Sequence, residues 1–325
     1  MTAGAASDIL PAVADTADQT TDRKRRRVLV LWYSQTGQLR RAAEALTGTM
    51  RDAGLQVDFQ ELIPRRPYPF PWSMRDFLSV FPATVQGRGC DLEPTTLSVE
   101  DYDLVVIAYT VWFLSPSLPT QGLFNAPPGE MLAGKPVVTL IACRNMWITA
   151  EEKMRRLIAA AGGRHVGTVA VVDDGPAWAS FVTTPRWLLT GKSGPFLFFP
   201  RAGISDATME KLAPFGAALA SRFDDVTSGR AVPFESLDTM ALDPPMVLPD
   251  IVIGRLFAPA ARALAGARER GGATAAVALG VFGAWLFSSV VVVVVALIVA
   301  QLTLRPLTRR VVNRHLDRLG VRRDA

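Results

Sequence analysis

Cysteine and histidine are scarce in this sequence. Two cysteines, Cys90 and Cys143, and two histidines, His165 and His315, occur among its 325 residues. So few cysteines predict no disulfide framework and fit a reducing compartment. The cysteines also lack the close spacing of a metal or redox pair, and so few histidines argue against a histidine-based catalytic triad. We therefore expect no metal site.

The first residues lack an apolar segment. Residues 1–22 are rich in Ala, Thr and Asp and have no apolar core of the kind a secretory signal requires. This composition predicts a disordered tail over residues 1–24. The basic run of residues 23–27 follows, and we interpret it as a solvated charge run, with a lipid-contacting patch as the alternative.

Charge is absent from residues 271–304, where six valines stand in succession at 290–295. A membrane span needs roughly 20 apolar residues, so this run predicts one transmembrane helix over about 273–304. Four arginines precede it between positions 255 and 270, and seven follow from position 305. We expect these arginines to contact anionic membrane lipids rather than nucleic acid. Residues 251–325 would then form a membrane anchor with a basic tail.

Between residues 25 and 225, short apolar runs alternate with segments of helical periodicity. The runs at 28–33, 56–62, 102–109, 136–142 and 165–172 predict five strands. Their alternation with helices predicts an α/β domain, doubly wound around a five-stranded parallel sheet of order 2-1-3-4-5. A Pro-rich linker over residues 226–250 would join this domain to the anchor.

Three further helices and two long insertions complete the expected domain. A capping box at Thr149 and Glu152 predicts the start of one helix, another is expected around residues 73–81, and a third over residues 205–223. The stretches 64–96 and 173–203 are long and rich in aromatic residues. We expect them to meet over the ligand site as an apolar cover.

A polar loop follows the first strand and precedes the first helix. It consists of Ser34, Gln35, Thr36, Gly37 and Gln38. A phosphate at this position would meet free N–H groups at the positive end of the helix dipole. The loop resembles the S/T-x-T-G-x-T phosphate loop of flavodoxins, except that a leucine, position 39, stands where the final Thr is usual. An ordinary helix-capping turn is the alternative.

Two more loops follow the third and fourth strands. They contribute Thr110, Val111, Trp112 and Phe113 from the first loop, and Cys143, Arg144 and Asn145 from the second. In flavodoxins these loops contact the flavin ring, so the resemblance implies a flavodoxin-like domain that binds FMN, with Trp112 stacked on the ring. FMN is favoured over FAD because no second phosphate loop is evident. Trp112 could instead be a core aromatic, and Arg144 could either face the ring or close a salt bridge.

A narrower resemblance involves the bacterial dialkylresorcinol condensing enzymes, which accompany ketosynthases in making aryl-polyene and alkylresorcinol lipids. It is carried by residues 33–39, 144–147 with Glu152 and Lys153, 190–192, and Pro200 with 202–205. The resemblance implies an aromatic or acyl small-molecule substrate and a ketosynthase or reductase partner. No ketosynthase Cys-His-His site is evident, and we assign no catalytic residue.

We therefore expect an FMN-dependent oxidoreductase or electron-transfer protein, with its α/β domain on the cytoplasmic face of the inner membrane. A condensing or aromatising tailoring enzyme of the same pathway and a flavin-free membrane scaffold are the alternatives. For the anchor, a signal-free chain favours export of the basic tail, whereas the positive-inside rule favours a cytosolic tail. We expect one long helix that continues into a basic helix; export of the tail is favoured over a cytosolic tail, and both orientations stay open. A helix lying flat is disfavoured because six successive valines give no polar face.

Overall fold

The computed structural model describes residues 26–125, 131–231, 233–234 and 242–319. The tail expected over residues 1–24 lies outside the described residues. Five parallel strands form one sheet: β1 (Arg27–Trp32), β2 (Gln56–Glu61), β3 (Leu104–Tyr109), β6 (Pro136–Cys143) and β7 (Arg164–Val172). Their order is β2-β1-β3-β6-β7, all paired in parallel. In chain order these strands run 2-1-3-4-5, so the predicted flavodoxin-like α/β fold is confirmed.

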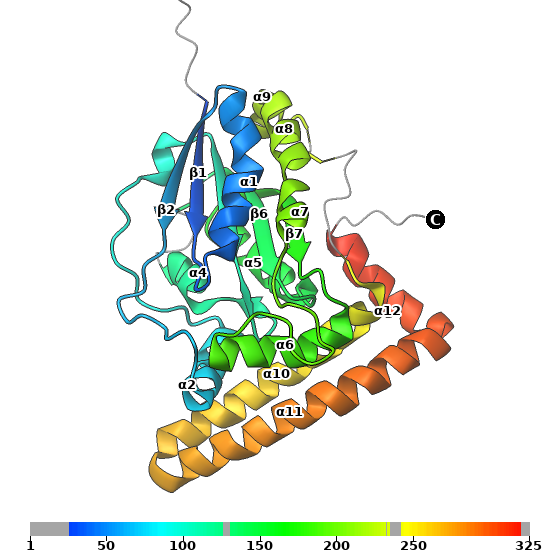
Figure 1. Cartoon of the computed structure of the whole chain (residues 1–325). Helices are drawn as coiled ribbons and strands as arrows, with labels where there is room; N and C mark the ends of the chain where they lie inside the picture. The colour runs from blue at the N-terminus through cyan, green and yellow to red at the C-terminus, as the bar shows by residue number, and fades with distance from the viewer. Residues whose placement is uncertain (1–25, 126–130, 232, 235–241, 320–325) are drawn as a thin grey trace, which may run out of the picture.

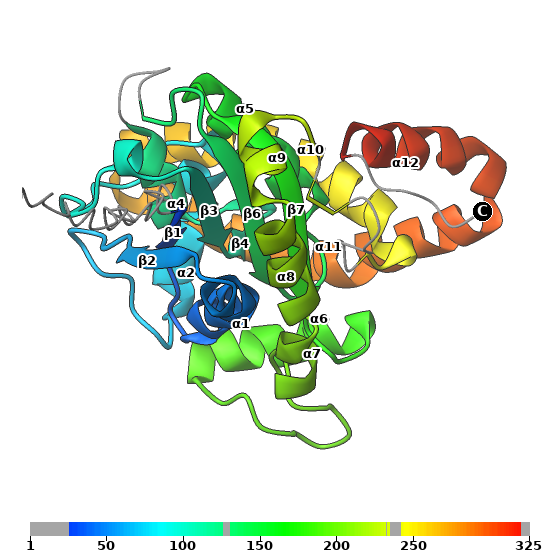
Figure 2. The same cartoon turned by 90° about the horizontal axis from the view of Figure 1, so that it is seen from above.

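Helices cover both faces of the sheet (Figure 2). α1 (Gln38–Asp52) and α8 (Ala213–Ser221) pack on one face, where Val28 and Val106 point into the first core cluster. α5 (Ile148–Ala160) covers the other face, where Leu29 and Ile107 belong to a second cluster. Because both faces are covered, β3 is buried at every position and its sequence is an unbroken apolar run.

The remaining helices are shorter than the sequence pattern predicts. The helix expected over residues 205–223 is divided into α7 (Asp206–Glu210), α8 and α9 (Phe223–Ser228). The helix expected around residues 73–81 is α2 (Met74–Ser79), followed directly by α3 (Phe81–Gln86). Gly216 of α8 explains one close approach, since a Cβ there would lie 1.8 Å from the carbonyl oxygen of Leu46 in α1.

The start of α5 differs from the expected capping box. Its N-cap residue is Trp147, and no side chain of its own segment caps it. Instead the N–H groups of Ile148 and Thr149 donate to the carboxylate of Asp250, at 2.9 and 3.0 Å. Burial raises the pKa of Asp250 to about 6, although its hydrogen bonds with Thr149 and Ile148 act in the opposite direction. The last residue of the expected linker is thus a buried cap that joins two helices remote in sequence.

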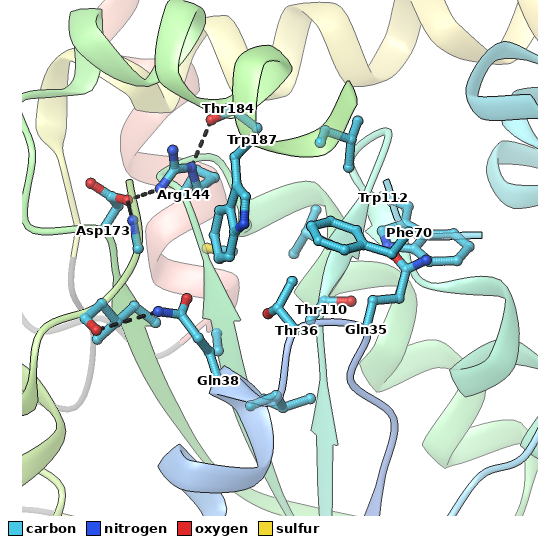
Figure 3. A pocket seen from close by; sticks show the side chains of 17 residues that line it. Gln35, Thr36, Gln38, Phe70, Thr110, Trp112, Arg144, Asp173, Thr184 and Trp187 are labelled. Atoms are coloured by element: carbon cyan, nitrogen blue, oxygen red, sulfur yellow. Dashed lines mark hydrogen bonds and ion pairs between the residues drawn. The ribbon is translucent and has the colours of Figure 1, made fainter. Parts of the chain in front are cut away.

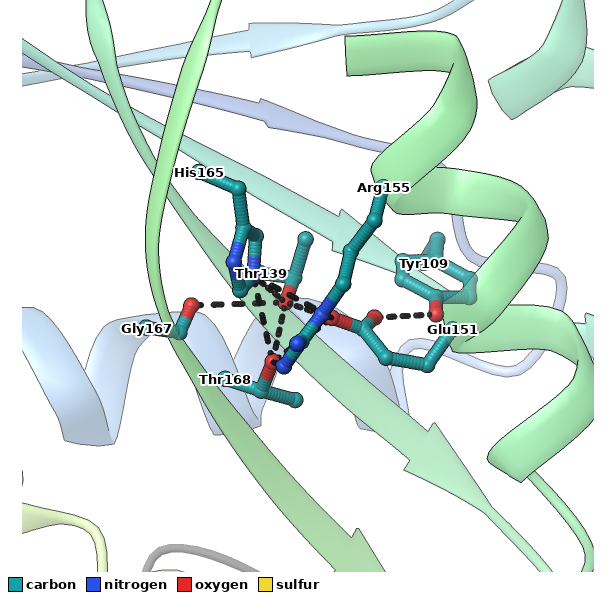
Figure 4. Close-up of polar contacts among 7 residues, drawn as sticks. All are labelled: Tyr109, Thr139, Glu151, Arg155, His165, Gly167 and Thr168. Atoms are coloured by element: carbon teal, nitrogen blue, oxygen red, sulfur yellow. Dashed lines mark hydrogen bonds and ion pairs between the residues drawn. The ribbon is translucent and has the colours of Figure 1, made fainter. Parts of the chain in front are cut away.

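A buried carboxylate ties α5 to the sheet below it (Figure 4). Oε1 of Glu151 accepts hydrogen bonds from Thr168 at 2.6 Å and from Nε of Arg155 at 2.9 Å, while Oε2 accepts from the Tyr109 hydroxyl at 2.8 Å. His165 Nε2 lies 3.2 Å from Oε1. Burial alone would raise the pKa of Glu151, but the contacts with His165 and Arg155 outweigh it and lower the pKa to about 2.

Three helices follow the α/β domain: α10 (Pro244–Arg270), α11 (Gly272–Thr303) and α12 (Arg305–Leu319). α10 begins inside the expected linker, because Met246, Val247 and Ile251 are buried against the domain. α10 and α11 form a hairpin that crosses the end of the sheet at which the strands finish (Figure 1). Within the described residues, α11 is the one helix long and apolar enough to cross a membrane. Of its most apolar stretch of 18 residues, 31% is buried inside the protein.

α11 confirms the long apolar helix expected over about 273–304, and the expected basic helix follows it as α12. The chain breaks at Leu304, and α12 turns back to the α/β domain, where Leu316 is buried and His315 Nδ1 lies 2.6 Å from Glu152 Oε1. α11 packs along α10. Phe282, Leu286 and Val294 cover its inner side by packing into a third core cluster.

Candidate functional site

A cavity of about 160 Å³ opens at the carboxyl ends of β1, β3 and β6 (Figure 3). Eight of the residues expected at the site line it: Gln35, Thr36, Gln38, Thr110, Val111, Trp112, Cys143 and Arg144. The four others, Ser34, Gly37, Phe113 and Asn145, are neighbours of these residues but do not line it. The structure thus brings the three predicted loops together at one edge of the sheet.

The loop between β1 and α1 has the backbone geometry of an anion site. Gly37 adopts a left-handed conformation, with φ 76° and ψ −12°, as the N-cap of α1. The first N–H groups of a helix have no partner inside it, and no acidic residue occupies the first turn of α1. Thr36 and Gly37 are exposed at the cavity end of the helix. An anion placed here would meet N–H groups and the positive end of the helix dipole.

Two glutamines fix the shape of this loop from opposite sides. Oε1 of Gln35 accepts a hydrogen bond from Trp72 Nε1 at 3.3 Å, and its Nε2 donates to the Pro69 carbonyl at 3.3 Å. Nε2 of Gln38 donates to the carbonyl of Ile204 at 3.4 Å. The two long insertions therefore buttress the loop, because Trp72 and Pro69 belong to the first and Ile204 directly follows the second.

Trp112 lines the cavity and also belongs to an aromatic cluster. Its ring meets those of Tyr33, Tyr68 and Trp72 edge-on, at centroid distances of 6.1, 5.2 and 5.4 Å. This packing holds the indole in a fixed orientation at the cavity wall. Phe113, expected beside it, turns away from the cavity and packs on Phe77 at 4.7 Å.

Two aromatic residues that the sequence analysis did not single out at the site complete its walls. Trp187, from α6 (Ala177–Thr190), reaches into the cavity, and Phe70 stands opposite (Figure 3). The centroids of their rings lie 6.2 Å apart, and the backbone N–H of Trp72 donates to the Leu188 carbonyl at 2.9 Å. The insertions thus meet at the cavity, as expected. Trp178 does not line it and is 57% exposed.

Arg144 closes a salt bridge and lines the cavity. Its guanidinium forms an ion pair with Asp173, and its Nε and Nη2 donate to Thr184 at 2.7 Å and Thr183 at 3.0 Å. The same group lies 5.6 Å from the centre of the Trp187 ring. Burial lowers the pKa of Arg144 to about 10, so the side chain is charged at neutral pH. Arg144 therefore anchors α6 and orients Trp187, and its partner Asp173 was not predicted.

The nucleophiles and bases near this cavity are few. Burial raises the pKa of the Cys143 thiol well above its ordinary value, so the thiolate is disfavoured. Both histidines lie among the described residues, and neither lines the cavity; His165 contacts Glu151 and His315 contacts Glu152. Over the described part of the chain, no group of three or more His, Cys, Asp or Glu side chains is placed to hold a metal ion.

Comparison with known proteins finds resemblance to solved structures in fold alone. No protein-family model and no curated protein matches the chain, so the resemblance to dialkylresorcinol condensing enzymes gains no support. Solved structures that resemble it include the flavodoxin of Streptococcus pneumonia TIGR4, at 14% identity and a TM-score of 0.35 over 60% of this chain and 99% of that one. Flavodoxin 1 from Bacillus cereus matches at 14% identity and 0.34, over 59% and 95%.

The flavodiiron protein of Giardia intestinalis matches at 14% identity and a TM-score of 0.36, over 63% of this chain. The match spans 38% of that longer chain. At such identities and scores these likenesses say nothing about ligand or activity. The strand order of the sheet gives this chain a flavodoxin-like fold.

Proposed function

We propose that this chain is an FMN-binding redox protein that works against a membrane surface. The observation that carries the proposal is the cavity at the carboxyl edge of the sheet, with a helix N-terminus at one side and aromatic walls around it. In doubly wound folds this edge is where ligands bind. The free N–H groups of the helix N-terminus and the aromatic walls support a phosphate-bearing flavin as the ligand.

The fit follows from the two kinds of group that line the cavity. The N–H groups of the α1 N-terminus, with the hydroxyl of Thr36, would hold the phosphate. Trp112, Trp187 and Phe70 would bound a planar ring and exclude water from it. The buried Leu39 contributes no donor, so backbone N–H groups would carry more of the phosphate binding than in a loop that ends in Thr.

Bound FMN would supply one- or two-electron transfer, which the side chains here cannot perform themselves. The protein's part is to hold the ring and set its surroundings. Arg144 brings a positive charge to the cavity wall, but Asp173 neutralises most of its field. We therefore expect Arg144 to act chiefly by fixing Trp187 and α6, and not as a free cation beside the ring.

The membrane part of the proposal rests on the outer side of α11. A row of residues at helical spacing is exposed there: Val277, Val281, Val292, Val295, Val299 and Leu302, each at least 49% exposed. Exposed arginines flank the hairpin on α10 and α12, among them Arg262, Arg268 and Arg310. An apolar face with basic flanks is typical of a helix that lies in the interface of an anionic bilayer.

A condensing enzyme is less well supported by the site. Carbon–carbon bond formation by a ketosynthase-like route needs a thiolate with histidine partners, whereas burial raises the pKa of Cys143 and neither histidine reaches the cavity. A flavin-free scaffold would leave the aromatic walls and the α1 N-terminus without a ligand. Flavin binding therefore separates these three functions.

The test is a titration of the apo-protein with FMN, followed by quenching of flavin fluorescence. We expect saturable quenching, and we expect Thr36→Ala to weaken binding by about 1–3 kcal/mol because it removes a donor to the phosphate. Thr227→Ala is the matched control, since Thr227 lies on α9 at the opposite end of the sheet (Figure 1). Equal affinity of the two variants would contradict the assignment of the loop.

A further inference from the structure

A second cavity, of about 260 Å³, lies between the first one and the α10–α11 hairpin. Its walls on the hairpin side are apolar: Ile253 and Phe257 from α10, and Leu286, Phe287 and Val294 from α11. α6 closes it with Phe181. Engineered apolar cavities of about 150 Å³ stay dry and take up benzene, so this larger cavity has room for part of an apolar ligand.

The opposite end of the second cavity is polar and touches the first. Four residues line both cavities: Val111, Cys143, Arg144 and Thr184. Asn145 and Ser180, joined by a hydrogen bond of 2.8 Å, add polar atoms at this end. None of the described residues that line the second cavity is acidic, and Arg144 is already paired with Asp173. No acidic side chain of the described lining residues attracts a cationic head here, and Asp173 already neutralises Arg144, so this end of the cavity favours a polar head without charge.

The hairpin also connects this cavity to the lipid-facing side. Val294, 1% exposed, lines the cavity, whereas Val292 on the same helix is 67% exposed on the outer face. Phe287 lines the cavity and is itself 36% exposed. A single helix thus separates the outer apolar face from the apolar interior, which gives a hydrocarbon chain a short route between them.

We propose that the second cavity binds one hydrocarbon chain of an amphiphile with an uncharged polar head. The chain lies against Phe257, Leu286 and Val294, and the head reaches Asn145 and Thr184 at the boundary with the first cavity. This inference rests on the proposed function, because it gives that site a lipid-like ligand beside the flavin. The volume of about 260 Å³ holds part of one hydrocarbon chain and leaves no room for a second, so a single-chain amphiphile is favoured over a two-chain phospholipid.

The test is photolabelling of the full chain in nanodiscs with a diazirine-tagged long-chain fatty alcohol, with labelled residues mapped by mass spectrometry. We expect label on α6 at Phe181 and Pro185, as well as on the outer face of α11. Excess untagged alcohol should abolish at least four-fifths of the α6 label, because that site saturates, and leave the outer-face label largely unchanged. A diazirine-tagged phosphatidylcholine should label the outer face alone.

Two matched variants locate the chain. Val294→Phe fills the cavity and should lower the α6 label at least fivefold, whereas Val292→Phe alters only the outer face and should leave it unchanged. Absence of α6 label, equal label in both variants, or equal α6 label from phosphatidylcholine would overturn the proposal. If Val294→Phe fails to fold, the competition experiment on the unmodified chain decides alone.

The outcome is separable from that of the proposed function, because the labelling needs no flavin. FMN binding without saturable α6 label would remove the lipid-like ligand and leave the redox proposal standing. Saturable α6 label without FMN binding would keep the cavity assignment and refute the redox proposal.

Discussion

The central strands and α11 have similar sequences and different surroundings. β3 reads LVVIAY and is buried at every position, while α11 contains six successive valines and shows Val292 and Val295 at 67% and 56% exposure. Helices cover both sides of β3, whereas α10 covers one side of α11. An apolar run therefore predicts that water is excluded, but whether protein or lipid excludes it depends on what packs alongside.

The largest effect should come from a charge placed on the buried apolar surface of the sheet, and the same charge on the exposed side of α11 should have almost none. Val106→Asp puts an unpaired carboxylate in the middle of the sheet, where the side chain is 0% exposed, and should cost more than about 4 kcal/mol of folding free energy. Val292→Asp should change the free energy of unfolding by less than about 0.5 kcal/mol, because its site is exposed. Urea unfolding measures both.

Vesicle binding by the same variants tests whether lipid covers the exposed side of α11. Val292→Asp should reduce co-sedimentation with vesicles of phosphatidylcholine and phosphatidylglycerol, since it places a charge on the exposed apolar side of α11 that we propose faces lipid. Arg262→Ala, on the flank of the hairpin, should have a smaller effect that disappears at high salt. Vesicle binding unchanged in Val292→Asp would show that α11 does not face lipid.

A smaller effect is expected from the buried carboxylate beneath α5. Glu151→Gln should cost about 3 kcal/mol, because it leaves the buried hydrogen-bond donors around it without a charged partner. The folded-state pKa of Glu151 is about 2, below its ordinary value of 4.5, so its contribution is present above pH 4.5 and is lost as the pH falls towards 2. Unfolding measured between pH 2 and 7 should therefore show a flatter profile in the variant. Glu44→Gln, on the exposed surface of α1, is the control.

A smaller loss of stability is expected when the contact of Asp250 on α10 with the start of α5 is removed. Asp250→Ala should cost about 1–2 kcal/mol, because two N–H groups of α5 lose their acceptor. Hydrogen exchange should accelerate at the Ile148 and Thr149 amides and along α10, and remain unchanged in β3. Unchanged exchange at these amides would mean that Asp250 does not hold the hairpin to the domain.

The raised pKa of Asp250 also predicts a pH dependence opposite to that of Glu151. An acid whose pKa rises on folding stabilises the fold below its unfolded pKa, and that stability is lost as the pH rises through about 6. Asp250→Asn removes this titration. Raising the pH from 4 to 6 should therefore lower the free energy of unfolding of the unmodified chain relative to that of Asp250→Asn.

Local signals account for the parts that the sequence predicts well. The five strands, the helix after Gly37 and the three loops follow from apolar runs and from a glycine at a position that needs positive φ. Strand order follows from the few ways to wind such units. These features depend on residues close to one another in the chain.

The parts that were missed depend on contacts between distant segments. Trp187 joins the cavity because Arg144 and Phe70 hold it there, and no local pattern on α6 marks it apart from Trp178. Asp250 caps a helix a hundred residues upstream, in a segment whose prolines resemble a linker. One side of α11 is buried against α10, which the composition of α11 does not reveal.

The most direct test of the central claim compares FMN with riboflavin, which has the same ring and no phosphate. If the N-terminus of α1 and the hydroxyl of Thr36 bind the phosphate, FMN should bind more tightly by roughly tenfold to a hundredfold. Thr36→Ala should narrow that difference, and Thr227→Ala should leave it unchanged. Equal affinity for the two flavins, or no saturable binding of either, would contradict the account.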